Sequence, residues 1–268
     1  MDLADRAWRL IEEETWHGPT NMALDEIAAR TAADEGLRTA RVYRWGPSTL
    51  SLGYNQRPES VDWEFCDAEG ITVTRRPTGG GGIYHDYTGD ISYTIVAPAD
   101  ELPGDLMDAY HVLCEPILDA LSRMGLDADY VSESVPEIHR PACYLRELHP
   151  AHDIVAGGKK ISGNAQYRQR DAVIQHGSIS YSRATDRHLG VFADGPENEE
   201  FEDRVTSVRA ETGLRRDEAV AALEDALADW TDADPGEWTD RELADARDLA
   251  ERKYATDAWT REKDEGSA

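Results

Sequence analysis

Arg75-Arg76-Pro77-Thr78-Gly79-Gly80-Gly81-Gly82-Ile83-Tyr84-His85-Asp86 is a glycine-rich stretch between two strand-like runs, at residues 71–74 and 91–96. Glycine loses more backbone freedom on folding than any other residue. Four in a row therefore persist where the backbone must approach a ligand closely or adopt positive φ. Two guanidinium groups precede the run, and an imidazole and a carboxylate follow it. Guanidinium groups beside exposed N–H groups suit a phosphate or carboxylate ligand. A flexible hairpin loop is the alternative, but these residue types favour an anion site.

The length and composition of the chain indicate a globular protein with one large domain. Its 268 residues can bury a full-sized core, and the hydrophobic content of 40% argues against disorder. No run of about 18 apolar residues is present, so neither a membrane span nor a membrane partner is expected. Residues 1–5 are acidic and no apolar segment accompanies them, so no secretory signal is expected. The expected location is the cytoplasm.

The charge of the chain is strongly negative. Asp and Glu number 54 against 28 Lys and Arg, a formal net charge of −26. Acidic, lysine-poor surfaces resemble those of proteins adapted to a salt-rich cytosol, where screening weakens self-repulsion. The same charge argues against nucleic acid as a partner, because phosphate binding needs a basic face. Only four lysines occur, and two of them, Lys159 and Lys160, are adjacent.

Strand and helix patterns alternate along most of the chain and give way to helices near its end. Strands are predicted at 8–11, 39–45, 49–54, 71–74, 91–96, 152–156, 159–167 and 172–181, and helices at 22–33, 59–69, 106–124, 217–230 and 240–254. This order predicts an α+β fold with a mixed or antiparallel β-sheet flanked by helices. We expect a main domain over 1–215 and a short C-terminal helical extension over 216–268. The turn-rich residues 132–150 are expected to form an exposed loop that can order over a ligand.

A second motif, Gly157-Gly158-Lys159-Lys160-Ile161-Ser162-Gly163-Asn164-Ala165-Gln166, combines a hairpin turn with the lysine pair. It is not a P-loop, because Asp153 and Lys160 stand where that motif needs glycine and Ser or Thr. Successive side chains of a strand face opposite sides, so only one of the two lysines can face a site. Lys160 shares its side with Ser162 and Asn164, and is predicted to hold a phosphate or acyl oxygen. A solvated hairpin lysine is the alternative, which the rarity of lysine in this chain disfavours.

Together these two motifs resemble those of the lipoate–protein ligase A family. Three further stretches match it in the same order along the chain: Asn21-Met22-Ala23-Leu24-Asp25-Glu26, Gln175-His176-Gly177-Ser178 and Lys253-Tyr254-Ala255-Thr256-Asp257-Ala258-Trp259. The matches spread from residue 8 to residue 259, which makes the resemblance more specific than one glycine motif. It implies the fold of the biotin/lipoate ligase catalytic domain over residues 1–215. It also implies that lipoate is attached to a lysine of a lipoyl carrier domain, through an acyl-adenylate made from ATP with Mg²⁺.

The resemblance also implies roles for individual residues. The residues implied to bind ATP or the adenylate are Arg76, Gly81, Gly82, Ile83, Tyr84 and Lys160. Lys160 is implied to contact the lipoyl group as well and to be catalytic. The implied lipoate pocket comprises Thr78, Gly79, Gly80, His85, Gly163, Ala165 and His176. The implied partners are apo lipoyl domains of E2 subunits or of glycine cleavage H-type carriers. Some small ligases of the family also rely on a separate accessory protein, so a second chain is a further expected partner.

Cys143, in Pro141-Ala142-Cys143-Tyr144, supports an alternative activity. It precedes the lysine motif much as the nucleophilic cysteine does in a related family of octanoyltransferases. Those enzymes move octanoyl from an acyl carrier protein through a thioester, without ATP. An ammonium at Lys160 would stabilise the thiolate that such catalysis needs. Two departures count against it: Gly81 stands where those enzymes usually have arginine, and the chain between Cys143 and Lys160 is longer than theirs. The ligase is therefore ranked first and the transferase second.

Three other interpretations are weaker. Cys143, His149 and His152 form a Cys-x5-His-x2-His spacing, which is too weak a pattern to predict a metal site. Biotin ligase is disfavoured because its Gly-Arg-Gly-Arg signature is absent. A non-catalytic protein that binds lipoyl domains is a third interpretation, disfavoured because the glycine loop and Lys160 are both intact.

Overall fold

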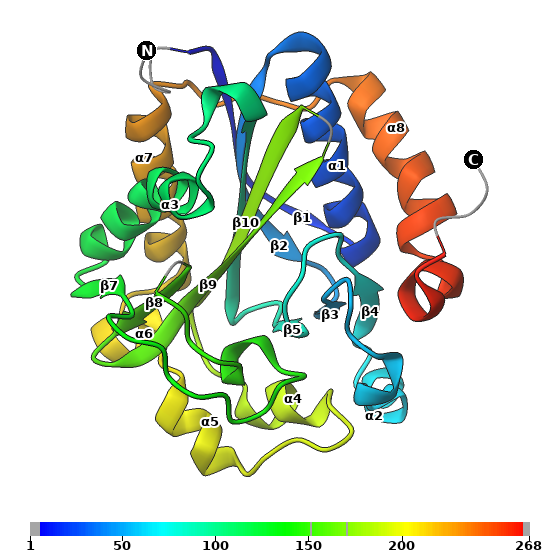
Figure 1. Cartoon of the computed structure of the whole chain (residues 1–268), viewed down its shortest axis with the longest axis vertical. Helices are drawn as coiled ribbons and strands as arrows, with labels where there is room; N and C mark the ends of the chain where they lie inside the picture. Colours follow the sequence, from blue (N-terminus) through cyan, green and yellow to red (C-terminus); the bar gives the residue numbers. More distant parts are fainter. Residues whose placement is uncertain (1–5, 151, 170, 265–268) are drawn as a thin grey trace.

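A seven-stranded mixed sheet crosses the middle of the computed structural model, which describes residues 6–150, 152–169 and 171–264 (Figure 1). In spatial order its strands are β1 (Trp8–Trp16), β2 (Arg38–Trp45), β6 (Asp90–Pro98), β10 (Ala172–Ser180), β9 (Lys159–Gln169), β8 (Asp153–Ala156) and β7 (Ala128–Tyr130). Strands β1 and β2 run parallel, and the other neighbours run antiparallel. A second sheet joins β4 (Thr72–Arg75), β3 (Thr49–Leu52) and β5 (Ile83–His85). The predicted α+β class with a mixed sheet is confirmed.

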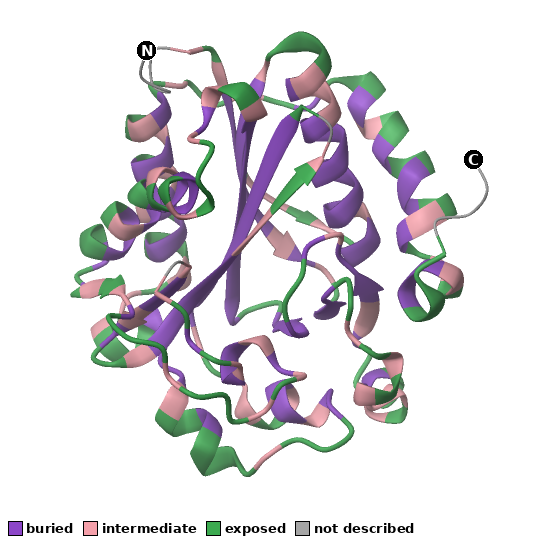
Figure 2. Ribbon diagram, viewed as in Figure 1, coloured by how far each residue is buried: buried purple, intermediate pink, exposed green. Residues whose placement is uncertain are grey.

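Helices cover both faces of the large sheet, because successive residues of a strand turn to opposite sides. In β2, Val42 packs into the cluster that holds α3 (Leu106–Arg123) and α7 (Arg216–Thr231). Its neighbour Tyr43 packs into the cluster that holds α1 (Gly18–Glu35) and α8 (Asp240–Leu249). Figure 2 shows the central strands largely buried between these helices, whose outer faces are exposed. The shorter helices are α2 (Trp63–Ala68), α4 (Thr185–Gly190), α5 (Asn198–Arg204) and α6 (Val208–Thr212).

The C-terminal helix α7 packs in the apolar cluster on one face of the large sheet, and α8 packs in the cluster on the other face. Both clusters also contain residues from earlier parts of the chain. A domain boundary at residue 215 therefore stays a prediction. In the described part of the chain, no helix combines the length and the apolar character that a membrane span requires. The expected lack of a secretory signal concerns residues 1–5, which lie outside the described residues.

Some elements differ in detail from the sequence prediction. The helix predicted at 59–69 is a 3-10 turn, Pro58–Ser60, followed by α2. The separation arises because Asp62 starts a new helix, accepting a hydrogen bond from Phe65 N at 2.9 Å. The helix predicted at 240–254 is α8 followed by a π-helical turn, Ala250–Tyr254. The strand β5 is absent from the sequence prediction, because three residues carry too little alternation to be recognised.

The prediction of an exposed loop over 132–150 is wrong for its second half. Ala142, Tyr144 and Leu145 are buried in an apolar cluster with Leu50 and Phe192. A 3-10 turn, Cys143–Leu145, shapes the segment. Its apolar residues stand among prolines and charges, which is why composition alone suggested a solvated loop. The segment is part of the folded domain, and it fixes the position of Cys143.

Candidate active site

Backbone hydrogen bonds join the glycine loop to the segment that carries Cys143. Gly82 N donates to Pro141 O at 2.6 Å, and Cys143 N donates to Gly82 O at 2.8 Å. Gly81 permits this approach, since a Cβ there would lie 2.7 Å from Pro141 O and 2.9 Å from Cys143 N. Gly80 has φ +97°, in the left-handed region that favours glycine. The glycine run therefore brings the Cys143 backbone close to the loop.

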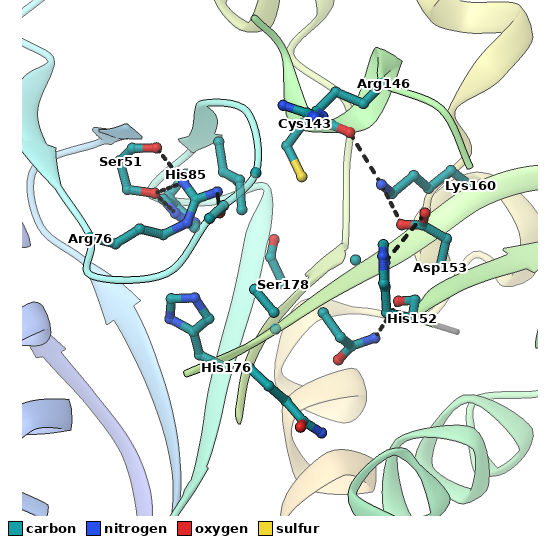
Figure 3. Close-up of a pocket in the computed structure, with 18 of the residues that line it drawn as sticks. Ser51, Arg76, His85, Cys143, Arg146, His152, Asp153, Lys160, His176 and Ser178 are labelled. Carbon is teal, nitrogen blue, oxygen red and sulfur yellow. Dashed lines mark hydrogen bonds and ion pairs between the residues drawn. The ribbon is translucent and has the colours of Figure 1, made fainter. Parts of the chain in front are cut away.

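A cavity of about 240 Å³ is lined by the glycine loop, the Cys143 segment, β9 and β10 (Figure 3). Figure 3 shows the Cys143 Sγ pointing into it, with Arg76 and His85 on one side and Lys160 and Asp153 on the other. Its apolar lining comprises Met22, Tyr43, Trp45, Ile83, Tyr110 and Ala165. An apolar wall that faces polar and charged side chains around one thiol suits a short acyl chain with a carbonyl at its end.

The two arginines before the glycine run do not face an anion. Arg76 is buried, and its five N–H donors are all bonded inside the protein, to Thr78 Oγ1, Ser51 O and Oγ, and the carbonyl oxygens of Gly79 and Gly81. Burial lowers the pKa of Arg76 to about 10. Arg75 likewise donates only to backbone oxygens, those of Gly53, Tyr54, Gln56 and Thr260. This corrects the expectation of two anion-binding guanidinium groups: both hold the loop, and none of the donors of Arg76 is left for a nucleotide.

We expect Arg76→Lys to lower the free energy of unfolding by about 2–4 kcal/mol. Lysine has three donors, so it leaves at least two buried oxygens unpaired at about 1–3 kcal/mol each. Urea denaturation measures the loss. Arg123→Lys is the matched control, because the guanidinium of Arg123 pairs with Asp119 and Asp229 near the surface. Its change should stay within about 0.5 kcal/mol. Equal stability of Arg76→Lys and wild type would contradict the role given to Arg76.

Lys160 projects from β9 into the cavity and pairs with Asp153 of β8. Its Nζ lies 2.6 Å from Asp153 Oδ1 and donates to Cys143 O at 3.2 Å. Burial by itself lowers the pKa of Lys160, but the electrostatic interactions with the Cys143 side chain and the Asp153 carboxylate outweigh it and hold the pKa above its ordinary value. Burial would likewise raise the pKa of Asp153, but the ammonium holds that pKa well below its usual range. Lys160 is 2% exposed, whereas Lys159 is only partly buried, as strand alternation predicts.

A chain of hydrogen bonds runs along the opposite wall. Ser51 Oγ lies 2.9 Å from His85 Nε2, and His85 Nδ1 lies 3.2 Å from Asp90 Oδ2. The imidazole is also stacked on Trp45, with ring centroids 4.0 Å apart. With its proton on Nδ1, facing Asp90, the ring presents Nε2 as an acceptor. A hydroxyl, an imidazole and a carboxylate in this order can take up a proton at the cavity wall.

His176 of β10 completes this wall. Its Nε2 lies 2.7 Å from Thr78 Oγ1, and its Nδ1 lies 3.7 Å from Asp25 Oδ2. Burial lowers the pKa of His176, so the ring is held neutral and acts here as a hydrogen-bonding group.

The structure brings most of the predicted site residues to one cavity. Those that line it are Arg76, Gly79, Gly80, Ile83, His85, Cys143, Lys160, Gly163, Ala165 and His176. Gly81 lines a neighbouring cleft, and Gly82, Tyr84 and Thr78 do not line the cavity. Tyr84 instead donates to Asp86 Oδ2 at 2.9 Å. Within residues 6–150, 152–169 and 171–264, no group of three or more His, Cys, Asp or Glu side chains could hold a metal ion.

Sequence reasoning missed several polar residues that line the cavity: Ser51, Arg146, Glu147, Asp153, Gln166 and Ser178. A signal for Asp153 exists: a two-residue Gly157-Gly158 turn places it opposite Ser162, on the side of Lys160. A bulge between Ile154 and Val155 shifts the pairing to Gly163 without separating the two charges. Ser51 gives no such signal, because its contact with His85 depends on the pairing of β3 with β5 across the glycine loop.

The family model of the lipoyl protein ligase A/B catalytic domain matches residues 17–230. The chain belongs to this family. Its sequence relatives include the octanoyltransferase LipM of Bacillus subtilis, 28% identical over 96% of this chain and 99% of the relative. The octanoyltransferase LipM of Kyrpidia tusciae is 31% identical over 96% of this chain and 100% of the relative.

Solved structures of lipoyl protein ligases have the same fold. Lipoate-protein ligase A bound with ATP matches with a TM-score of 0.78 and 28% identity, over 96% of this chain and 99% of that one. Protein Ta0514 of T. acidophilum, with bound lipoic acid, matches with a TM-score of 0.78 and 27% identity over the same shares. These findings confirm the family resemblance and the fold it implied. The names of the sequence relatives, however, agree with the activity that the sequence ranked second.

Proposed function

We propose that this lipoyl protein ligase A/B family member is a cysteine-dependent octanoyltransferase. It would move an octanoyl group from an acyl carrier protein to a lysine of an apo lipoyl domain, of the E2 or glycine cleavage H type. The position of Cys143 carries the proposal. Its Sγ points into the cavity, and its carbonyl oxygen accepts a hydrogen bond from Lys160 (Figure 3). A ligase that activates lipoate with ATP needs no thiol at this point.

The reaction has two halves. In the first, the Cys143 thiolate, whose proton His85 has taken, attacks the donor thioester carbonyl. A new C–S bond forms, the C–S bond of the donor breaks, and the donor leaves as a thiol with the proton that His85 returns. In the second, the amine of the target lysine attacks the acyl-enzyme, an amide bond forms, and Cys143 takes the proton that the amine loses. The ammonium of Lys160 stabilises the thiolate and the oxyanion of each tetrahedral intermediate. In this proposal His85, bonded to Ser51 and Asp90, is the proton acceptor of the cavity.

Two observations favour the transferase over the ligase. The guanidinium of Arg76 has no donor left for ATP, since all five bond the protein. The structure also explains why residue 81 is glycine: the Cys143 segment fills the space that a side chain at this position would need. It therefore no longer counts against a transferase.

A ligase that uses lipoate, ATP and Mg²⁺, alone or with an accessory protein, is the second candidate. The match to lipoate-protein ligase A bound with ATP supports it.

Donor dependence tests the proposal. With octanoyl carrier protein as donor, we expect the purified protein to octanoylate an apo lipoyl domain without ATP, because the thioester already carries an activated acyl group. With lipoate, ATP and Mg²⁺ we expect no lipoylated domain. Mass spectrometry of the acceptor domain, at low and high salt, measures both reactions. The reverse pattern would establish the ligase instead. A protein that is inactive with both donor sets yet binds the domain would be the non-catalytic alternative.

A further inference from the structure

A second cleft, of about 730 Å³, opens beside the active cavity. The two share Gly79, Gly80 and Arg146, so the cleft and the cavity meet at the glycine loop. Two more arginines, Arg57 and Arg140, line the cleft, and no Asp or Glu does. We refer to it as the arginine cleft.

The arginine cleft concentrates unpaired positive charge on a very acidic protein. Asp and Glu outnumber Lys and Arg by 54 to 28, so carboxylates are abundant as partners. Even so, the side chains of Arg57, Arg140 and Arg146 make no hydrogen bond or ion pair with any other described residue. Three unpaired guanidinium groups at one opening create a local positive potential on an otherwise acidic protein, and this potential attracts an anion.

The glycine loop adds backbone donors to the same cleft. The N–H groups of Gly79, Gly80 and Gly81 donate to no acceptor among the residues that the structure describes. Gly79 and Gly80 are also exposed. Successive free N–H groups beside guanidinium groups match the oxygens of a phosphate, each of which accepts several hydrogen bonds.

We propose that the arginine cleft binds the phosphodiester of a carrier protein's phosphopantetheine arm. This inference rests on the octanoyltransferase function proposed above. An acyl carrier protein presents its acyl thioester on a pantetheine arm, which a phosphodiester joins to the protein. With that phosphodiester held by Arg57 and Arg140, the arm passes Gly79, Gly80 and Arg146 and delivers the thioester to Cys143. The acceptor lysine carries no phosphate, so the cleft serves the donor half of the reaction only.

Donors with and without a phosphate test the assignment. We expect Arg57→Gln and Arg140→Gln each to lower kcat/KM for acylation of Cys143 by octanoyl carrier protein about tenfold, and the double variant by more. With octanoyl-pantetheine, which lacks the phosphate, every variant should react within about twofold of wild type. Intact-protein mass spectrometry follows the acyl-enzyme. Arg247→Gln is the matched control, because Arg247 is exposed in α8 and equally unpaired, but far along the chain from the cleft.

Salt gives a second measurement on the same variants. Raising the ionic strength from about 0.1 M to about 1 M shortens the Debye length from about 10 Å to about 3 Å. The ratio of kcat/KM between wild type and the double variant, with octanoyl carrier protein as donor, should therefore become smaller at high salt. If the arginine variants lost kcat/KM equally with both donors, or lost none with the carrier protein, the phosphate assignment would be wrong, and the proposed octanoyltransferase activity would be unaffected. A wild-type enzyme that neither donor acylates would overturn the proposed function itself.

Discussion

Cys143→Ala is expected to abolish octanoyl transfer, with a loss of at least about 10³-fold in rate, because the acyl-enzyme can no longer form. The Cys143 Sγ points into the cavity, with Lys160 and Arg76 on opposite sides (Figure 3). Incubation with octanoyl carrier protein should therefore add one octanoyl group to wild type and none to the variant. Intact-protein mass spectrometry measures this, and release of the group by hydroxylamine identifies it as a thioester.

Cys66→Ala is the matched control for this prediction. Burial raises the pKa of both Cys66 and Cys114 to about 12, so neither supplies a thiolate near neutral pH. Cys66→Ala should be acylated at the wild-type rate. Full octanoyl transfer by Cys143→Ala would rule out the thioester mechanism. Lipoylation by Cys143→Ala that depends on ATP would restore the ligase.

The parts of this site that could be predicted are those with a local chemical pattern. Four glycines between strands, and a lysine that shares its strand side with Ser162 and Asn164, indicated a ligand site from the sequence alone. The order of the family motifs then predicted the fold, and the structure brings the lysine and the loop to one cavity. The structure explains why one of these residues is glycine: a side chain at Gly81 would clash with Pro141 and Cys143.

The parts that could not be predicted depend on contacts between distant segments. Arginines beside glycines suggested an anion site, but Arg75 bonds the carbonyl of Thr260, 185 residues away, and Arg76 bonds Ser51. Such pairing decides whether a guanidinium faces a ligand or the protein, and no local pattern encodes it. The Cys143 segment was misjudged for the same reason, because its burial depends on Leu50 and other residues of a distant part of the chain.

Lys160→Met is expected to lower the free energy of unfolding by about 3–5 kcal/mol and to stop acylation of Cys143. The substitution leaves Asp153, which is 2% exposed, as a buried carboxylate without its ammonium partner. The pH dependence has a definite sign. In wild type the pKa of Asp153 is held below its ordinary value, so its stabilising contribution is present above about pH 4 and lost as the pH falls. In the variant, burial without the ammonium raises the pKa of Asp153, so the carboxyl takes up a proton above about pH 4 and the deficit begins to shrink there as the pH falls. The deficit shrinks further below about pH 4, where the wild-type contribution is lost. Urea denaturation at several pH values measures it.

The double variant Lys160→Met/Asp153→Asn separates the structural role of the lysine from its chemical role. With both charges removed, stability should return to within about 2 kcal/mol of wild type, because no unpaired charge stays buried. Acylation of Cys143 should still be at least about 10²-fold slower than in wild type, because the ammonium that stabilises the thiolate and the oxyanion is gone. Lys159→Met, one residue away on the other side of β9, should keep wild-type acylation. If the double variant regained activity together with stability, Lys160 would be only the partner of Asp153, and the cation at the reacting carbonyl would have to come from another residue.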